Sequence, residues 1–153
     1  MNKKKIWIKA ILIPLVIGGI VGILTSGSME EFSHLTKPPL APPGIVFPIV
    51  WGILYVLMGI SYARLETKGM MNSKTKLIYY AQLLVNALWS IIFFMLKWRL
   101  FAFFWILLLI ALVITMIVVF YQKDKVAGLL QIPYLLWISF AAYLTMGIYL
   151  LNR

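Results

Sequence analysis

Five long apolar stretches, separated by short polar segments, dominate the pattern of hydrophobic and polar positions along this chain. They cover approximately residues 6–25, 46–64, 77–96, 100–121 and 126–151. A helix needs about 20 mostly apolar residues to cross a bilayer, whereas a membrane-spanning strand would alternate apolar and polar side chains. These stretches do not alternate. The pattern therefore predicts an all-α integral membrane protein, a five-transmembrane-helix bundle that forms one domain over residues 1–153.

Composition supports this prediction and excludes several other classes of protein. Of the 153 residues, 63% are hydrophobic and 12% are charged, and the mean hydropathy is +0.99. A soluble domain carries about 25% charged residues. The chain has no cysteine, which excludes disulfides, thiolate metal sites and cysteine nucleophiles. It also has no Walker loop, dinucleotide-binding glycine pattern, HExxH motif or paired catalytic carboxylate.

The basic residues indicate how the chain is oriented. The net charge is +10, but Lys and Arg lie at the ends of apolar stretches rather than along a soluble stripe, so we expect no nucleic-acid partner. Ten of the 14 Lys and Arg residues fall in the amino-terminal segment and in the second and fourth connections. The positive-inside rule then places the amino terminus in the cytoplasm. Because Pro14 lies in the first stretch and no small-residue cleavage site follows it, we expect a mature helix rather than a signal peptide.

The first connection, residues 26–44, is the longest and holds the only histidine, His34, and a lysine, Lys37. It also contains two Pro-Pro pairs, Pro38, Pro39, Pro42 and Pro43. Proline fixes its own φ and extends the residue before it, so this loop is stiff. It is either a plain connector, a ligand for an SH3-type domain, or a lid over a cavity. His34 has no cysteine or carboxylate partner set, so we predict no metal site and interpret it as a loop residue.

Polar and aromatic side chains recur at helical spacing inside three of the stretches. Gln82, Asn86 and Trp89 share one face of the third stretch, where they form either helix–helix contacts or a pocket wall. Trp51 and Tyr55 share a face of the second stretch. A face of the fifth stretch carries Tyr134, Trp137, Ala141 and Leu144, and Ala142 follows Ala141. We interpret these faces as converging on one aromatic cavity, in which the alanines leave room for a flat ligand or allow close helix packing.

The remaining tryptophans and the glycines have simpler interpretations. Trp7, Trp98 and Trp105 are expected in the aromatic belts at the membrane interfaces. Gly18 and Gly22 form a GxxxG pattern, and Gly52 and Gly59 share a helical face, so both pairs are candidates for close helix packing or a subunit contact.

Taken together, these residues resemble the translocator protein family (TspO/MBR), also described as tryptophan-rich sensory proteins or peripheral benzodiazepine receptors. The resemblance covers nearly the whole chain. It rests on four segments in a fixed order: KPPLAPP at 37–43, VFPIVWGILYVLMG at 46–59, QLLVNALWSIIFF at 82–94 and PYLLWISFAAYL at 133–144. The short length resembles the bacterial members, which implies a bacterial cell membrane. Two positions depart from the family pattern: Thr145 stands where many members have Asn, and the sterol-recognition segment is kept only loosely, through Leu144, Tyr149 and Arg153.

The resemblance implies a five-helix bundle, a homodimer, and one cavity beneath the first loop. It implies binding of tetrapyrroles such as protoporphyrin IX, of isoquinoline and benzodiazepine-type ligands and of other hydrophobic drug-like molecules, with no tightly bound cofactor. The family's cavity residues correspond here to Trp51, Asn86, Trp89, Trp137, Ala141 and Leu144.

Three functions follow as hypotheses. The first is a membrane receptor and sensor for porphyrins. The second adds light- and oxygen-dependent breakdown of bound protoporphyrin IX, with Trp51 and Trp137 as the reactive neighbours. The third is a transporter of tetrapyrroles or other small hydrophobic molecules.

Overall fold

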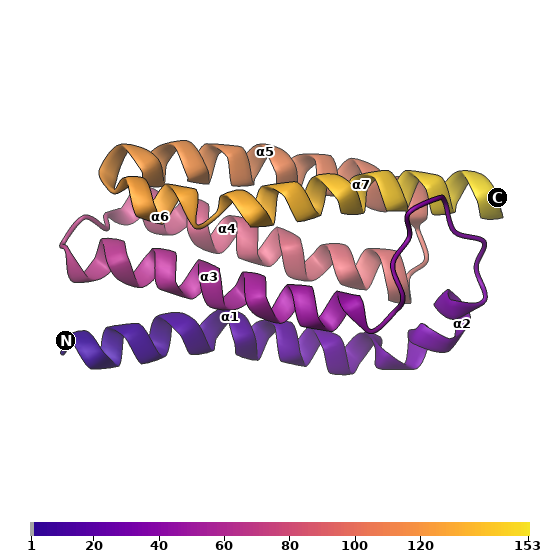
Figure 1. The fold of residues 1–153 in the computed structure, drawn as a ribbon, viewed down its shortest axis with the longest axis horizontal. Coiled ribbons are helices and arrows are strands. Elements are labelled where there is room, and N and C mark those ends of the chain that lie inside the picture. Colours follow the sequence, from indigo (N-terminus) through magenta and orange to yellow (C-terminus); the bar gives the residue numbers. More distant parts are fainter. Residues whose placement is uncertain (1) are drawn as a thin grey trace.

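The computed structural model describes residues 2–153, and five long helices run side by side along its long axis (Figure 1). Their bounds are α1 Lys3–Thr25, α3 Val46–Thr67, α4 Ser73–Ser90, α5 Arg99–Lys123 and α7 Ile132–Asn152. Five helical segments built on these helices are long and apolar enough to cross a membrane. A helix satisfies its own backbone hydrogen bonds, which lipid cannot do. The predicted all-α membrane bundle is therefore confirmed, and the chain begins and ends at opposite ends of it (Figure 1).

The first connection is more ordered than the sequence pattern suggested. The expectation of a loop over residues 26–44 was wrong for residues 26–33, which form η1 (Ser26–Ser28) and α2 (Met29–Ser33). The irregular part is residues 34–45, which we call the strap. Its four prolines keep residues 38–43 out of a helix, since each lacks the N–H that a helix needs.

Two other spans depart from simple helices. α4 continues into the π-helical segment η2 (Ile91–Met95), in which the Leu96 N–H donates to the carbonyl oxygen of Ile91 over 3.0 Å. The last span is broken into α6 (Lys125–Leu129) and α7, with a turn at Leu130 and Gln131 between them. η2 contains no proline. Pro133, by contrast, lies in the first turn of α7, where its missing N–H favours a break before it, so the sequence did signal the second interruption.

Trp105, which we expected at a membrane interface, also joins two helices. Its indole Nε1 lies 2.8 Å from the carbonyl oxygen of Val85 and donates to it, which joins α5 to α4. Hydrogen bonds between helices and close van der Waals packing hold a bundle together in lipid, where the hydrophobic effect does not drive helices toward one another.

Glycine lets α1 and α3 approach closely at two points. A Cβ on Gly59 would lie 2.5 Å from the Cα of Ile11, and one on Gly18 would lie 2.3 Å from the ring of Tyr55. Gly22 and Gly52 face open space. Gly18 and Gly59 are therefore packing positions between α1 and α3, whereas Gly22 and Gly52 are not.

We predict that Gly59→Ala destabilises the protein and that Gly52→Ala does not. The new methyl group at residue 59 meets α1 backbone, which cannot rotate away, and overpacking of this kind costs roughly 1–3 kcal/mol. The matched change at residue 52, in the same helix, meets nothing within 4 Å and replaces a poor helix former. Thermal unfolding in detergent measures both, and equal unfolding temperatures would contradict the packing assignment.

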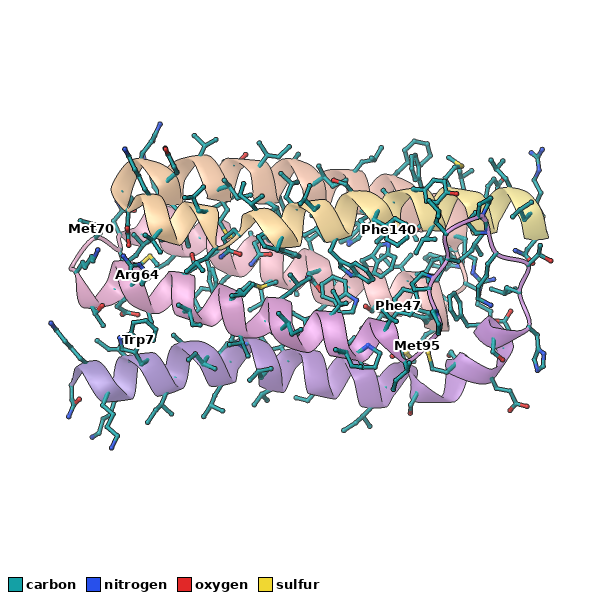
Figure 2. All side chains as sticks on the ribbon, viewed as in Figure 1. Trp7, Phe47, Arg64, Met70, Met95 and Phe140 are labelled. Atoms are coloured by element: carbon teal, nitrogen blue, oxygen red, sulfur yellow. The ribbon has the colours of Figure 1, made fainter. Side chains whose placement is uncertain are left out.

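At the amino-terminal end of the bundle, a carboxylate joins two connections. Asp124 lies between α5 and α6, and its side chain is 8% exposed. Its oxygens accept from Arg64 Nε at 2.8 Å and from Lys68 Nζ at 3.4 Å. Trp7, Arg64 and Met70 mark this end in Figure 2. The hydrogen bond from the Arg64 guanidinium is the main reason that the pKa of Asp124 lies below its ordinary value, and Lys68 lowers it further.

The depressed pKa predicts how stability depends on pH. The ion pair contributes fully above the ordinary carboxyl pKa of 3.8 and is lost as pH falls through the lower folded value. Asp124→Asn removes the charge, so the variant should unfold at a lower temperature than the unmodified chain at pH 7. The gap should narrow progressively below about pH 4. Unfolding temperatures from pH 3 to pH 8 test this, and a gap independent of pH would refute it.

Candidate functional site

A buried polar network joins three helices in the middle of the bundle. Tyr55 Oη of α3 donates to Asn86 Oδ1 of α4 at 3.0 Å. Asn86 Nδ2 donates to Tyr134 Oη of α7 at 2.7 Å, and Tyr134 in turn donates to Gln82 Oε1 at 2.7 Å. Gln82 Nε2 lies 3.9 Å from Met58 Sδ. Each hydroxyl and amide is thus used within the protein, as polar groups in a membrane require.

Aromatic rings form a continuous series between this network and the strap. Trp51 stacks on Tyr55 with centroids 5.6 Å apart and meets Trp137 edge-on at 6.5 Å. Phe47 contacts Trp137 at 5.8 Å and Phe32 of α2 at 6.1 Å. We call the whole series the aromatic cluster, and its members are Phe32, Phe47, Trp51, Tyr55, Trp89, Phe93 and Trp137.

Trp89 belongs to the cluster by an indirect route. Its indole stacks on Phe93 at 5.2 Å, and Phe93 contacts Phe32 at 5.9 Å. It therefore reaches Trp51 and Trp137 through phenylalanines instead of touching them. Phe47, which is labelled in Figure 2, sits at the end of the bundle where the strap passes.

Two indoles of the cluster have no hydrogen-bond acceptor. Within the described residues, Trp89 Nε1 and Trp137 Nε1 are buried and make no hydrogen bond. A buried donor without a partner costs about 1–3 kcal/mol, and such groups concentrate where a ligand or water completes the structure. The cluster therefore offers apolar ring faces together with two unused donors.

The strap crosses the end of the bundle and attaches to α7 (Figure 1). The side-chain amide of Asn152 makes two hydrogen bonds to Thr36, accepting from its N–H at 2.9 Å and donating to its carbonyl oxygen at 2.7 Å. Tyr143 Oη donates to the carbonyl oxygen of Pro39 at 2.7 Å. Pro38 packs against Gly147, where a Cβ would lie 2.6 Å from its ring. These contacts fasten the middle of the strap to a helix to which neither of its ends is joined.

The other strap residues have local roles. His34 is exposed. Lys37 Nζ lies 3.3 Å from the carbonyl oxygens of Ser33 and Leu35 and 4.9 Å from the ring centroid of Phe32. The carbonyl oxygen of Pro43 accepts from the Val46 N–H at 3.0 Å, which starts α3; Pro42 is half-buried beside it.

An apolar groove of about 380 Å³ lies on the outside of the cluster, between α3 and α7. Trp137 lines it and also contacts Trp51 inside the bundle. The other lining residues are Val50, Ile53, Leu54, Pro133, Leu136 and Phe140. The groove is open on its outer side, so it would cover only one face of a ligand.

The residues chosen from sequence occupy three places. Trp51, Tyr55, Trp89 and Trp137 belong to the aromatic cluster; Gln82, Asn86 and Tyr134 belong to the polar network; Ala141, Ala142 and Leu144 are buried on α7. Sequence reasoning missed Phe32, Phe47 and Phe93. Phe47 was detectable, since it lies one helical turn before Trp51, but Phe32 is placed by a short helix that the pattern did not predict. It also missed the attachments at Tyr143, Gly147 and Asn152.

We predict that Tyr134→Phe costs more stability than Tyr55→Phe. Loss of the Tyr134 hydroxyl leaves both Asn86 Nδ2 and Gln82 Oε1 without their partner, at roughly 1–3 kcal/mol. Loss of the Tyr55 hydroxyl leaves only one group, Asn86 Oδ1, without its partner, so its cost should be about half as large. Thermal unfolding in the same detergent compares the two variants. If Tyr55→Phe proved equally or more harmful, Tyr134 would not be the centre of the network.

Comparison with known proteins agrees with this architecture. The TspO/MBR family matches residues 10–151. The tryptophan-rich protein TspO of Archaeoglobus fulgidus is 39% identical over 99% of each chain. Protein CrtK of Rhodobacter capsulatus is 37% identical over 79% of this chain and 78% of its own. The translocator protein of Ovis aries is 30% identical over 90% of this chain and 86% of its own. A match over most of the chain, with five membrane helices in one bundle, establishes that this protein belongs to the TspO/MBR family.

Proposed function

We propose that this TspO/MBR protein is a membrane receptor that binds porphyrins, protoporphyrin IX among them, at the aromatic cluster beneath the strap. Isoquinoline and benzodiazepine-type molecules would use the same ring faces. The observation that carries the proposal is the pair of buried, unpartnered indole donors at Trp89 and Trp137 within a series of aromatic rings. A planar ligand with ring nitrogens or carbonyl groups supplies both stacking area and acceptors.

The chemistry of a porphyrin fits this surface. Contacts between aromatic rings add about 0.5–1.5 kcal/mol each beyond burial. The rings of Trp51 and Trp137 already touch, so a macrocycle would enter by turning these side chains apart. Its propionates would point toward the strap, where Lys37 Nζ contacts two carbonyl oxygens at 3.3 Å and the face of the Phe32 ring. A carboxylate is a stronger partner for an ammonium than a neutral carbonyl.

One observation favours transport as the alternative. The groove between α3 and α7 lies on the outside of the bundle, and Trp137 lines both this groove and the cluster. A hydrophobic molecule dissolved in the bilayer could reach the cluster past Trp137 without passing the strap. Transport would need a second way out, which the strap side would supply only if the strap moved away from α7.

Light- and oxygen-dependent breakdown of bound porphyrin is an extension of the same proposal. The bound macrocycle would absorb the light and dioxygen would be the oxidant, so no acid–base residue is required. Trp51 and Trp137 would lie against the excited ring as its readily oxidised neighbours. In that case the protein would be an enzyme as well as a receptor.

We predict that Trp51→Phe and Trp137→Phe each weaken protoporphyrin IX binding by roughly two- to tenfold, because phenylalanine keeps a ring but loses the larger face of the indole and, at residue 137, the N–H donor. The measurement is a titration of detergent-purified protein in the dark, followed by the porphyrin absorbance so that removal of an indole does not change the signal. Trp7→Phe, at the opposite end of the bundle (Figure 2), is the matched control and should bind normally.

Two further measurements on the same proteins, illumination and uptake into vesicles, separate the three functions. Illumination with dioxygen should give a new absorbing product if the protein breaks the ligand down, and the product should be lost in Trp51→Phe and Trp137→Phe. Passage of porphyrin into protein-containing vesicles, without breakdown, would favour transport. Dark affinities that are the same in all four proteins would refute the site.

We also propose a bacterial cell membrane as the location, with the amino terminus in the cytoplasm, and a homodimer as the assembly. The orientation is supported by charge: Arg64, Lys68 and the lysines of the amino-terminal segment lie at one end of the bundle. Reaction of single engineered cysteines with an impermeant reagent on intact cells tests the orientation, because only residues on the outer side react.

A further inference from the structure

A second pocket, separate from the aromatic cluster, lies between the start of α5 and the end of α7. Its volume is about 420 Å³, and it shares no lining residue with the cluster. Three of its lining residues are cations and three are aromatic: Lys97, Arg99 and Arg153, and Trp98, Phe101 and Tyr149. None of its lining residues is acidic.

The charges of this pocket are poorly balanced. Arg99 pairs with Glu31 of α2 at 3.1 Å. Among residues 2–153, neither Lys97 nor Arg153 has a carboxylate within 4.0 Å. Two of the four acidic residues of the chain, Glu66 and Asp124, lie at the other end of the bundle. A concave surface with excess positive charge raises the local concentration of anions.

The backbone at Lys97 forms the tight turn that leads from η2 to α5. Lys97 has φ +59, in the left-handed region, directly after η2. The chain reverses there, with the Trp98 N–H donating to the carbonyl oxygen of Ile92 at 3.2 Å. Helices usually end on glycine in this conformation, because a side chain makes it unfavourable. The turn places Lys97 in the lining of the pocket together with Arg99.

The rest of the lining is suited to an amphiphile. Trp98 is 57% exposed and Phe101 is 49% exposed, next to the cations. Tryptophan and tyrosine mark the headgroup level of a bilayer, and basic pockets between membrane helices bind anionic headgroups. A free phosphate would use only the cations, whereas a lipid would also cover the apolar side chains.

From this we infer that the pocket binds one anionic phospholipid, with the phosphate between Lys97, Arg99 and Arg153 and an acyl chain along Phe101. The site also bears on the strap. Asn152 lines the pocket and holds Thr36, and Arg99 holds Glu31 just before the strap. A lipid here therefore lies against one attachment of the strap, at Asn152, and against the ion pair that holds α2.

Native mass spectrometry of the full-length protein in detergent tests the inference, with phosphatidylglycerol and phosphatidylcholine of equal chain length offered together. We expect a preferred phosphatidylglycerol adduct. Lys97→Gln with Arg153→Gln should weaken it roughly fivefold for each charge removed. The matched control is Lys74→Gln with Lys125→Gln, two exposed lysines at the other end of the bundle, which should keep the adduct.

A second variant keeps the test decisive if the double variant folds poorly. Lys97→Gly should raise the unfolding temperature without anionic lipid, because glycine favours this backbone, and should still lower phosphatidylglycerol binding about fivefold. Wild-type phosphatidylglycerol binding by Lys97→Gly would overturn the proposal, as would an equal loss in the control. Displacement of the adduct by millimolar inorganic phosphate would overturn its assignment to a lipid.

Discussion

The bundle depends on one constraint: a polar side chain inside lipid must find its partner within the protein. The hydroxyl of Tyr134 meets this constraint by accepting a hydrogen bond from Asn86 and donating one to Gln82. Asn86 also accepts from Tyr55, so the network joins three helices. Apolar contacts in a membrane are nearly as good with lipid as with another helix, so they do not fix how helices are rotated. Directional hydrogen bonds do. The faces that carry Trp51 and Trp137 point inward because Tyr55 and Tyr134, one turn or less away, are held there.

The aromatic cluster follows from that rotation. Its rings come from α2, α3, α4, η2 and α7, and each would be exposed to lipid if its helix were turned. The cluster keeps every ring in contact with another but leaves two indole donors unused. The polar network and the aromatic cluster therefore differ in an informative way. Every polar side chain of the network has a hydrogen-bond partner within the chain, whereas two indole N–H donors of the cluster have none among the described residues.

Periodicity was enough to predict the membrane helices and to group Gln82 with Asn86, and Tyr134 with Trp137, because spacing along one helix is visible in sequence. It was not enough to pair residues between helices. Nothing in the sequence says that Trp105 bonds to Val85, or that Trp89 reaches Trp137 only through three phenylalanines. The short helix α2 and the π-helical segment η2 also escaped prediction, because both occupy a few residues with no periodicity of their own. Only the three-dimensional packing shows which glycine of each pair lies against a neighbouring helix.

The fastening of the strap has a consequence for how quickly molecules exchange with the protein. Its polar contacts to Tyr143 and Asn152 are at exposed residues, where water competes for every hydrogen bond and each is worth little. Because its prolines make the strap stiff, it would move away from α7 as one rigid piece and not one residue at a time. Residence time and affinity would then be set by different parts of the molecule. The buried rings would determine the affinity for a ligand. The solvated hydrogen bonds between the strap and α7 would determine how often the strap opens and lets the ligand leave.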